Sequence, residues 1–246
     1  MAVLWVVDAA RAAEGQLTGP SAKLLRTNSS VRAALLDKKK TGATTANRLG
    51  CRHTSRVTQQ ELFGASAPLP EGFAYAPDFL SATQEQELLE AIRALPFEQA
   101  HYRQWRARRR IVSFGGRYDF TRNELLTAPP IPAFLLPLRA QVAQWAALSA
   151  QAIEHAMIAE YRPGTPLGWH RDVPSFEAIA GISLHGRARL RFRPWPPAQG
   201  GRAARAINLE PRSAYAMRGV ARWGWQHAVS PTPELRYSIT FRTRRS

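Results

Sequence analysis

Cysteine is almost absent from this chain of 246 residues. The single cysteine, Cys51, excludes an intrachain disulfide and any zinc site built from several thiolates, so a metal site would need histidine and carboxylate ligands. Nothing requires an oxidising compartment, and we expect a cytoplasmic protein, associated with the nucleoid if its source is bacterial. No apolar run approaches the roughly 18–20 residues that span a bilayer, so we expect no membrane partner.

Acidic side chains are heavily outnumbered by basic ones. The chain holds 34 Lys and Arg against 18 Asp and Glu, a formal net charge of +16 at pH 7. A surplus of this size favours polyanionic partners, and nucleic acid, DNA or RNA, comes first among them. A basic surface that only keeps the protein soluble is the alternative, and charge alone does not separate the two.

Lysine is confined to one end of the chain, since all four lysines lie in the first forty residues. Residues 1–57 are rich in Ala, Ser, Thr and basic groups, and we interpret them as a basic, disordered extension. Residues 58–246 are long enough to bury a core of their own, and we expect them to act as a monomer. We assign residues 58–155 to helices and a lid, and residues 156–246 to a core of strands.

Two amphipathic segments predict helices in the first half of this domain. The stretch SATQEQELLEAIRAL, residues 81–95, opens with Ser81 as an N-cap, continues with acidic residues and repeats its leucines at helical spacing. A second helix is predicted within residues 131–150, beginning near Pro132, with Pro137 in its first turns or at a kink.

After these helices the pattern changes to short segments of strand-type alternation, separated by Pro and Gly. Residues 181–192 look like a hairpin that turns at His185–Gly186, and residues 207–217 look like a second hairpin that turns at Pro211–Arg212. Helices followed by many short strands predict an α+β fold, an antiparallel sandwich or jelly roll with helices on one side.

The stretch GWHRDVP, residues 168–174, places His170 and Asp172 two residues apart, so both side chains project to one side of an extended chain. Two histidines and one carboxylate form the facial triad of non-haem Fe(II) oxygenases. His227, in WQHAVSP late in the strand region, is the best candidate for the third ligand. The remaining histidines lie in the extension, near an arginine run, before the strands or in a predicted turn: His53, His101, His155 and His185. An HxD pair alone is often a surface pair, so more of the pattern is needed.

More of that pattern is present near the end of the chain. In RYSITFR, Arg236 and Arg242 are six residues apart, and on a strand an even spacing places them on one face. Two inward guanidinium groups would be costly without partners, and a dianionic ligand would remove that cost. An edge strand with its arginines in solvent is the alternative, especially since Arg244 and Arg245 follow.

In this order on predicted strands, the HxD pair, the distal histidine and the two arginines resemble the AlkB family of Fe(II)- and 2-oxoglutarate-dependent dioxygenases. The resemblance covers roughly residues 58–246, through EYRPGTPLGWHRD, WQHAVSP and RYSITFR. It implies a double-stranded β-helix, or jelly roll, with flanking N-terminal helices. It also implies Fe(II), 2-oxoglutarate and O2 as cofactor and cosubstrates, and oxidative dealkylation, usually of N-alkylated nucleobases.

The resemblance implies a role for each matching residue. His170, Asp172 and His227 correspond to the metal ligands. The residues that correspond to the 2-oxoglutarate site are Arg236 for the distal carboxylate, Arg242 near the keto-acid end and the metal-bound aspartate, and Tyr161 as a hydroxyl donor.

Two positions depart from the family pattern. Ala159 stands where an asparagine often contacts 2-oxoglutarate, and Pro174 stands where many nucleic-acid demethylases carry an acid that reads the damaged base. The second departure keeps one alternative open, the same oxygenase chemistry on a protein side chain or small molecule. A catalytically idle jelly roll that binds nucleic acid through charge is a further alternative, and the intact set of candidate metal and 2-oxoglutarate residues argues against it.

The run RQWRARRRIVSFGGRYDF, residues 103–120, mixes arginines with aromatic residues where the family places its nucleotide-recognition lid. Arginine neutralises phosphate and an aromatic ring stacks on a base. We therefore predict a substrate-binding role for Trp105, Arg110 and Tyr118, and for Trp169 beside the HxD pair. The arginines of residues 103–110 are too many and too close for all to be buried, so we expect most of them to face solvent or phosphate. Phe114 is the aromatic residue of the run that best fits a core position.

Overall fold

The structure is a computed structural model that describes residues 68–102, 105–119, 122, 124–197 and 204–245. The predicted extension, residues 1–57, lies outside the described residues, and its boundary stays a prediction. The elements in chain order are β1 (Phe73–Ala76), α1 (Ala82–Arg93), β2 (Glu98–Tyr102), β3 (Trp105–Phe114), β4 (Arg117–Asp119), β5 (Glu124–Leu126), η4 (Ala133–Leu135), α2 (Leu136–Trp145), β6 (Ile153–Tyr161), β7 (Leu167–His170), β8 (Phe176–Leu184), β9 (Ala188–Pro194), β10 (Arg205–Leu209), β11 (Ala214–Met217), α3 (Gly219–Trp223), β12 (Trp225–Val229) and β13 (Arg236–Arg244).

Two antiparallel sheets face each other and form the jelly roll that the strand pattern predicted. The major sheet has the strand order β1-β11-β8-β13-β6-β3-β2, and the minor sheet has the order β10-β9-β12-β7. A cluster of apolar side chains from both sheets fills part of the space between them, with Ile179 and Met217 from the major sheet and Leu190 and Phe192 from the minor sheet. The predicted α+β class with a jelly-roll core is therefore confirmed.

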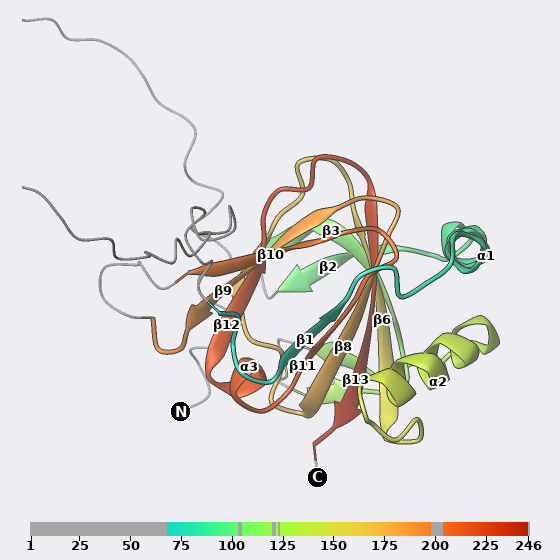
Figure 1. Ribbon diagram of the computed structural model, residues 1–246. Coiled ribbons are helices and arrows are strands. Elements are labelled where there is room, and N and C mark those ends of the chain that lie inside the picture. Colours follow the sequence, from blue (N-terminus) through green and yellow to red (C-terminus); the bar gives the residue numbers. More distant parts are fainter. Residues whose placement is uncertain (1–67, 103–104, 120–121, 123, 198–203, 246) are drawn as a thin grey trace, which may run out of the picture. The chain divides into compact units, whose positions relative to one another are not determined.

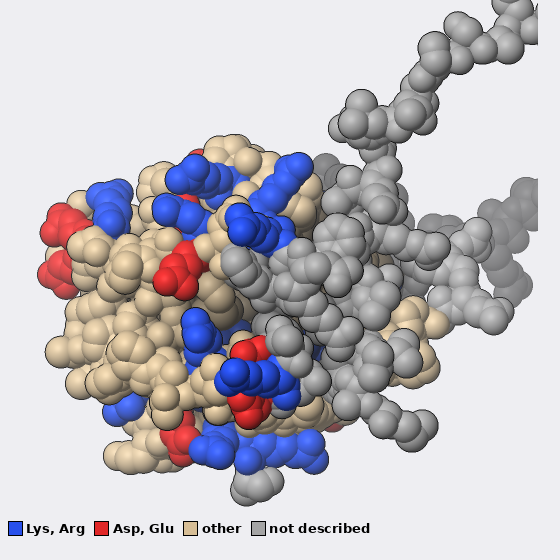
Figure 2. Space-filling model, turned by 180° about the vertical axis from the view of Figure 1, so that it is seen from behind, with Lys and Arg blue, Asp and Glu red and all other residues tan. Residues whose placement is uncertain are grey.

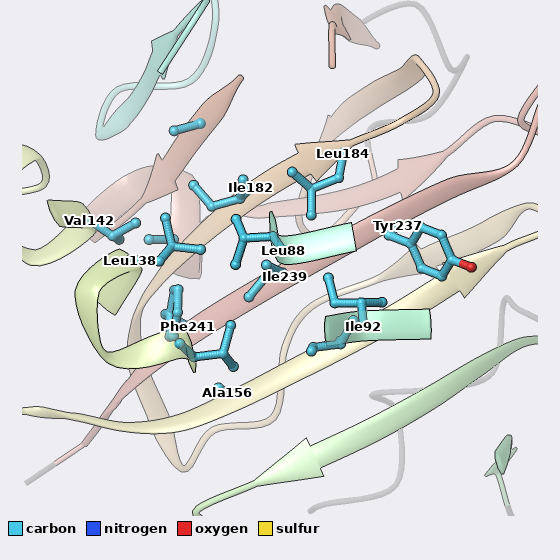
Figure 3. Close-up of a cluster of buried hydrophobic side chains, with 14 of the residues drawn as sticks. Leu88, Ile92, Leu138, Val142, Ala156, Ile182, Leu184, Tyr237, Ile239 and Phe241 are labelled. Carbon is cyan, nitrogen blue, oxygen red and sulfur yellow. The ribbon is translucent and has the colours of Figure 1, made fainter. Parts of the chain in front are cut away.

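The N-terminal helices α1 and α2 cover the other face of the major sheet (Figure 1). Ser81 caps α1 as predicted: its side chain accepts a hydrogen bond from the Gln84 backbone, and the Gln84 side chain binds back to the Ser81 N–H. Apolar residues of both helices meet strands β6, β8 and β13 in a second cluster, drawn in Figure 3: Leu88, Ile92, Leu138, Val142, Ala156, Ile182, Leu184, Tyr237, Ile239 and Phe241. Within the described part of the chain, no helix is both long and apolar enough to cross a membrane.

Both predicted hairpins are wrong. The turn at His185–Gly186 joins β8 of the major sheet to β9 of the minor sheet, and the turn near Arg212 joins β10 of the minor sheet to β11 of the major sheet. The chain therefore crosses between sheets at both turns. Alternation and turn residues are the same for a hairpin and for a sheet-to-sheet corner, because both need a tight reversal and only the strand partner differs.

The two corners lie side by side and hold each other. The backbone N–H of Arg212 donates to the carbonyl of Ser183 at 2.8 Å, and the N–H of Ser183 donates to the carbonyl of Ser213 at 2.9 Å. His185 and Arg212 both have positive φ, of 68° and 64°. The corners are thus set by backbone pairing between segments about thirty residues apart.

Candidate metal centre and 2-oxoglutarate site

Strand β13 presents one face to each side of the major sheet. Tyr237, Ile239 and Phe241 pack in the cluster under the helices. The alternate positions, which include Arg236 and Arg242, therefore face the space between the sheets. Arg236 is 1% exposed and Arg242 is 7% exposed, so the interpretation of an edge strand with arginines in solvent does not hold.

The structure brings His170, Asp172 and His227 together at the edge of the minor sheet. His170 ends β7 and is paired in register with His227 on β12, and their ring centroids are 4.2 Å apart. Asp172 follows two residues after His170, and its Oδ2 lies 3.7 Å from His227 Nε2. The neighbouring strands β7 and β12 thus supply the two histidines, and the loop that follows β7 supplies Asp172.

The two histidines have the protonation that a metal ligand needs. His170 Nδ1 lies 2.9 Å from the carbonyl oxygen of Gly168. Since a carbonyl oxygen only accepts, Nδ1–H donates to it, which leaves the Nε2 lone pair available. Burial lowers the pKa of His170, and burial followed by the neighbouring His170 ring lowers the pKa of His227. Both rings are therefore neutral at physiological pH.

Asp172 is held as a carboxylate by Arg242. Arg242 donates from Nη2 and Nε to Asp172 Oδ1, at 3.0 and 3.3 Å. Burial alone would raise the pKa of Asp172, but the positive charge of Arg242, with smaller contributions from other neighbours, lowers it well below its usual range. Arg242 Nη1 lies 3.2 Å from Nδ1 of His155, a buried ring whose pKa burial and Arg242 lower to about 3.

An Fe(II) ion fits the chemistry of this donor set, which is two neutral imidazoles and one carboxylate. Among the described residues, no group of three or more His, Cys, Asp or Glu side chains is arranged closely enough to hold a metal ion as it stands. The fit therefore rests on the identity, protonation and mutual approach of the three groups.

The aspartate loop is anchored by Arg222, a residue that the sequence did not single out. Arg222 lies on the short helix α3, is 2% exposed, and donates from Nη2 to the carbonyls of Asp172, Val173 and Phe176, at 3.1, 2.8 and 2.9 Å. No local pattern marks such a residue, because its carbonyl partners lie about fifty positions away in the chain.

At the other end of the inner face of β13, Arg236 is surrounded by neutral groups. Arg236 donates from Nε to Ser183 Oγ at 2.9 Å, and its guanidinium carbon lies 5.1 Å from the ring centroid of Tyr161. Tyr215, whose pKa burial raises to about 12, packs directly over Gly181, where a Cβ would collide with its ring. Within the described residues, no carboxylate forms an ion pair with Arg236. No local sequence pattern marks Ser183 and Tyr215 as part of this site, because only the fold brings β8 and β11 beside Arg236.

The predicted substrate residues whose side chains the structure describes do not gather at one place. Arg110 is paired with the buried Glu160, with Nε–Oε1 at 2.9 Å and Nη2–Oε2 at 2.7 Å, while its side chain stays 36% exposed, and its substrate-binding role stays a prediction. Tyr118 is half-buried on β4, opposite Leu125, which packs on the cluster between the sheets. The side chain of Trp105 lies outside the described ones, so its role stays a prediction.

Trp169 faces away from the metal ligands. It precedes His170 on β7, and adjacent strand residues project to opposite faces of a sheet. Its ring contacts the guanidinium groups of Arg191 and Arg193, at 4.9 and 4.7 Å from the ring centroid. Trp169 is therefore on the outer face of the minor sheet and does not stack on a base held beside His170.

The arginine run on β3 divides between the two faces of the major sheet. Arg106 and Arg108 are exposed, whereas Arg109 is 6% exposed and its charge contributes to the lowered pKa of His170. Arg109 does not face solvent, because its strand position turns it inward. Phe114 is 7% exposed and packs in the core beneath the helices, as its position in the sequence favoured.

Comparison with known proteins identifies the family. A model of the 2OG-Fe(II) oxygenase superfamily matches residues 72–242, and the chain belongs to this superfamily. Its members are oxygenases that use Fe(II) and 2-oxoglutarate, as the superfamily's name states.

Within the superfamily the chain is AlkB-like, which confirms the resemblance found in the sequence. It is 26% identical over 182 residues to the Alkylated DNA repair protein ALKBH8 homolog of Arabidopsis thaliana, a match that covers 64% of this chain and 50% of that protein. It is 27% identical over 189 residues to Uncharacterized protein L905 of Acanthamoeba polyphaga mimivirus, covering 70% and 84%. The solved structure of OsALKBH1 shares the fold, with a TM-score of 0.55 at 16% identity over 70% of this chain and 98% of that one.

Proposed function

We propose that this chain is an Fe(II)- and 2-oxoglutarate-dependent dioxygenase that oxidatively dealkylates N-alkylated bases in DNA or RNA. The observation that carries the oxygenase part is the pair of buried arginines on one face of β13. Arg242 faces the carboxylate of Asp172, while Arg236 has only neutral groups around it among the described residues. A buried guanidinium without a carboxylate is costly, and the carboxylate of a keto acid removes that cost.

In this proposal His170, Asp172 and His227 bind the metal, and Arg236 binds the distal carboxylate of 2-oxoglutarate. Tyr161, directly across from Arg236 on β6, contributes its ring and hydroxyl to the same site. Arg242 keeps Asp172 ionised and oriented, and Arg222 fixes the loop that carries it. Fe(II) and 2-oxoglutarate, when bound, supply the oxidation of the alkyl carbon by O2.

Nucleic acid as the substrate is supported by the net charge of +16 and by the likeness to a relative whose name describes repair of alkylated DNA. Pro174 favours a second candidate, the same chemistry on a protein side chain or small molecule. It follows two residues after Asp172 and offers no acid to read a base.

Turnover of 2-oxoglutarate against a substrate panel tests the proposal. The panel contains N-methylated oligonucleotides, the corresponding free nucleosides, and methylated peptides, and the readouts are succinate and released aldehyde. We expect aldehyde from a methylated oligonucleotide, and none from the Asp172→Ala variant. Aldehyde from a peptide alone would establish the second candidate. Absence of any 2-oxoglutarate turnover with iron present would overturn both.

A further inference from the structure

The two faces of the minor sheet differ completely in character. On β9, Ala188, Leu190 and Phe192 are buried against the major sheet, whereas the intervening Arg189, Arg191 and Arg193 point to the other side. This outer face also contains Trp169 of β7 and Gln226 of β12, which is the register partner of Arg193. We call the set of Trp169, Arg189, Arg191 and Arg193 the outer arginine face.

Trp169 orients two of these arginines. The guanidinium carbons of Arg191 and Arg193 lie 4.9 and 4.7 Å from its ring centroid, and Arg193 Nε donates to Gln226 Oε1 at 2.6 Å. A guanidinium that stacks on an aromatic ring keeps its in-plane N–H donors for other acceptors. Both guanidinium groups are therefore held against one ring, which lowers the entropy lost when they bind an anion.

Carboxylates are missing from this face, unlike the rest of the described surface. Residues 185–209 include no Asp or Glu, and their arginines are Arg187, Arg189, Arg191, Arg193, Arg202 and Arg205. Elsewhere arginine side chains lie beside acidic ones in several places, as Figure 2 shows for one face of the molecule. Among the described residues, Arg189 and Arg191 form no ion pair with a carboxylate. No carboxylate among the described residues therefore compensates the positive charges of Arg189 and Arg191.

We propose that the outer arginine face binds the phosphate backbone of the nucleic-acid substrate. This inference rests on the proposed function, and it adds a contact surface separate from the metal centre. Arginine is the residue best suited to phosphate, and such contacts hold a nucleic acid in place without reading its sequence. β7 is the edge strand of the minor sheet, with His170 on its inner face and Trp169 on its outer face. A nucleic-acid strand bound to the outer face would therefore lie next to β7, and the candidate metal ligands lie on the inner side of the same sheet edge.

Binding to an unmodified, fluorescein-labelled oligothymidylate tests the inference through the dependence of Kd on salt. The test variant is Arg191→Ala/Arg193→Ala, and the matched control is Arg93→Ala/Arg244→Ala, which removes two exposed arginines from α1 and from the end of β13. Each phosphate contact to a single strand adds about 0.7 to the slope of log K against log salt. We expect the test variant to lose up to about 1.4 from that slope and to bind roughly 10-fold more weakly at moderate salt, while the control stays within about twofold of the unmodified protein.

Trp169→Ala separates orientation from charge, because it removes no charge. We expect it to weaken binding by roughly threefold, and Trp169→Phe to retain most of the affinity, since phenylalanine also offers a ring face. Thermal melting checks that all variants fold. Equal losses in the test and control variants would overturn the outer arginine face as a binding surface.

The binding experiment distinguishes failure of the proposed nucleic-acid substrate from failure of the outer arginine face. If the unmodified protein bound no oligothymidylate at any salt concentration, the nucleic-acid substrate itself would be rejected, and the inference with it. If the protein bound, and the test variant bound equally well, only the outer arginine face would be rejected. Uncoupled 2-oxoglutarate turnover should be the same in the test variant and the unmodified protein, because Arg191 and Arg193 lie on the opposite face from the metal ligands.

Discussion

Arg236 and Arg242, at the two ends of the inner face of β13, are both buried cations, but they differ in the groups that surround them. At one end Arg242 meets the carboxylate of Asp172 and the neutral ring of His155. At the other end Arg236 meets the hydroxyl of Ser183 and the ring of Tyr161, which carry no negative charge. Both arginines are buried, so the difference lies in what compensates them. Arg242 serves a group of the protein itself, while Arg236 is arranged for an anion that comes from outside.

The largest expected effect follows from removing the uncompensated cation. In Arg236→Ala the distal carboxylate of 2-oxoglutarate would lose its charge-assisted hydrogen bonds, and we expect its binding to weaken by about 2–5 kcal/mol. Anaerobic calorimetric titration of the iron-loaded protein measures this. Arg244→Ala, at the exposed end of the same strand, should cost under about 1 kcal/mol. Equal effects of the two substitutions would contradict the assignment of Arg236.

Removing Arg242, whose charge is compensated by Asp172, should weaken the binding of Fe(II) and not that of 2-oxoglutarate. Arg242→Met would free Asp172 from its guanidinium partner, and loss of such a supporting contact typically lowers metal affinity by about 10–100-fold. Competition with a chelator for Fe(II) measures the change. Arg245→Ala, an exposed arginine of the same chain end, is the control. An unchanged iron affinity would show that Arg242 has no influence on Asp172.

The Arg242 end should also be the more acid-sensitive of the two, because His155 is buried there with a pKa of about 3. The unfolded chain, in which the pKa of a histidine is about 6.5, binds the proton first, so stability falls as the pH drops from about 6.5 towards 3. The contribution of one histidine is at most about 1.4 kcal/mol per pH unit.

The substitution His155→Gln, measured without metal, isolates this effect. Glutamine keeps an acceptor for Arg242 and cannot be protonated in this range. The difference in unfolding free energy between the two proteins, from denaturant titrations at several pH values, should be constant above pH 6.5 and should shift in favour of the variant below it. A difference independent of pH would mean that His155 is not the group that titrates.

The smallest expected effect lies at the Arg236 end. Ser183→Ala removes the hydroxyl that accepts from Arg236 Nε, and we expect a loss of about 1 kcal/mol in 2-oxoglutarate binding, with iron affinity unchanged. The exposed Ser149→Ala is the control. A loss of iron affinity in Ser183→Ala would show that the two ends of β13 are not independent.

Residues on a common strand face could be assigned from the sequence, because alternation is a property of the local backbone. The six-residue spacing of Arg236 and Arg242 and the two-residue spacing of His170 and Asp172 predicted which side chains share a side. The same rule placed Trp169 opposite to His170, although its aromatic character alone suggested a base-stacking role beside the metal. A substrate-binding role for Trp169 therefore stays a prediction, now for the outer face of the minor sheet.

What the sequence by itself determined is therefore local: the Ser81-capped helix, the strands, the face to which each residue projects, and the order of the candidate ligands. Only the tertiary structure decided which strands are neighbours. It turned two predicted hairpins into corners between sheets, brought Ser183 to Arg236, and placed Arg222 under the Asp172 loop. The physical reason is range: φ, ψ and side-chain period act over a few residues, whereas sheet pairing and buried charge here depend on groups that lie tens of positions apart in the chain.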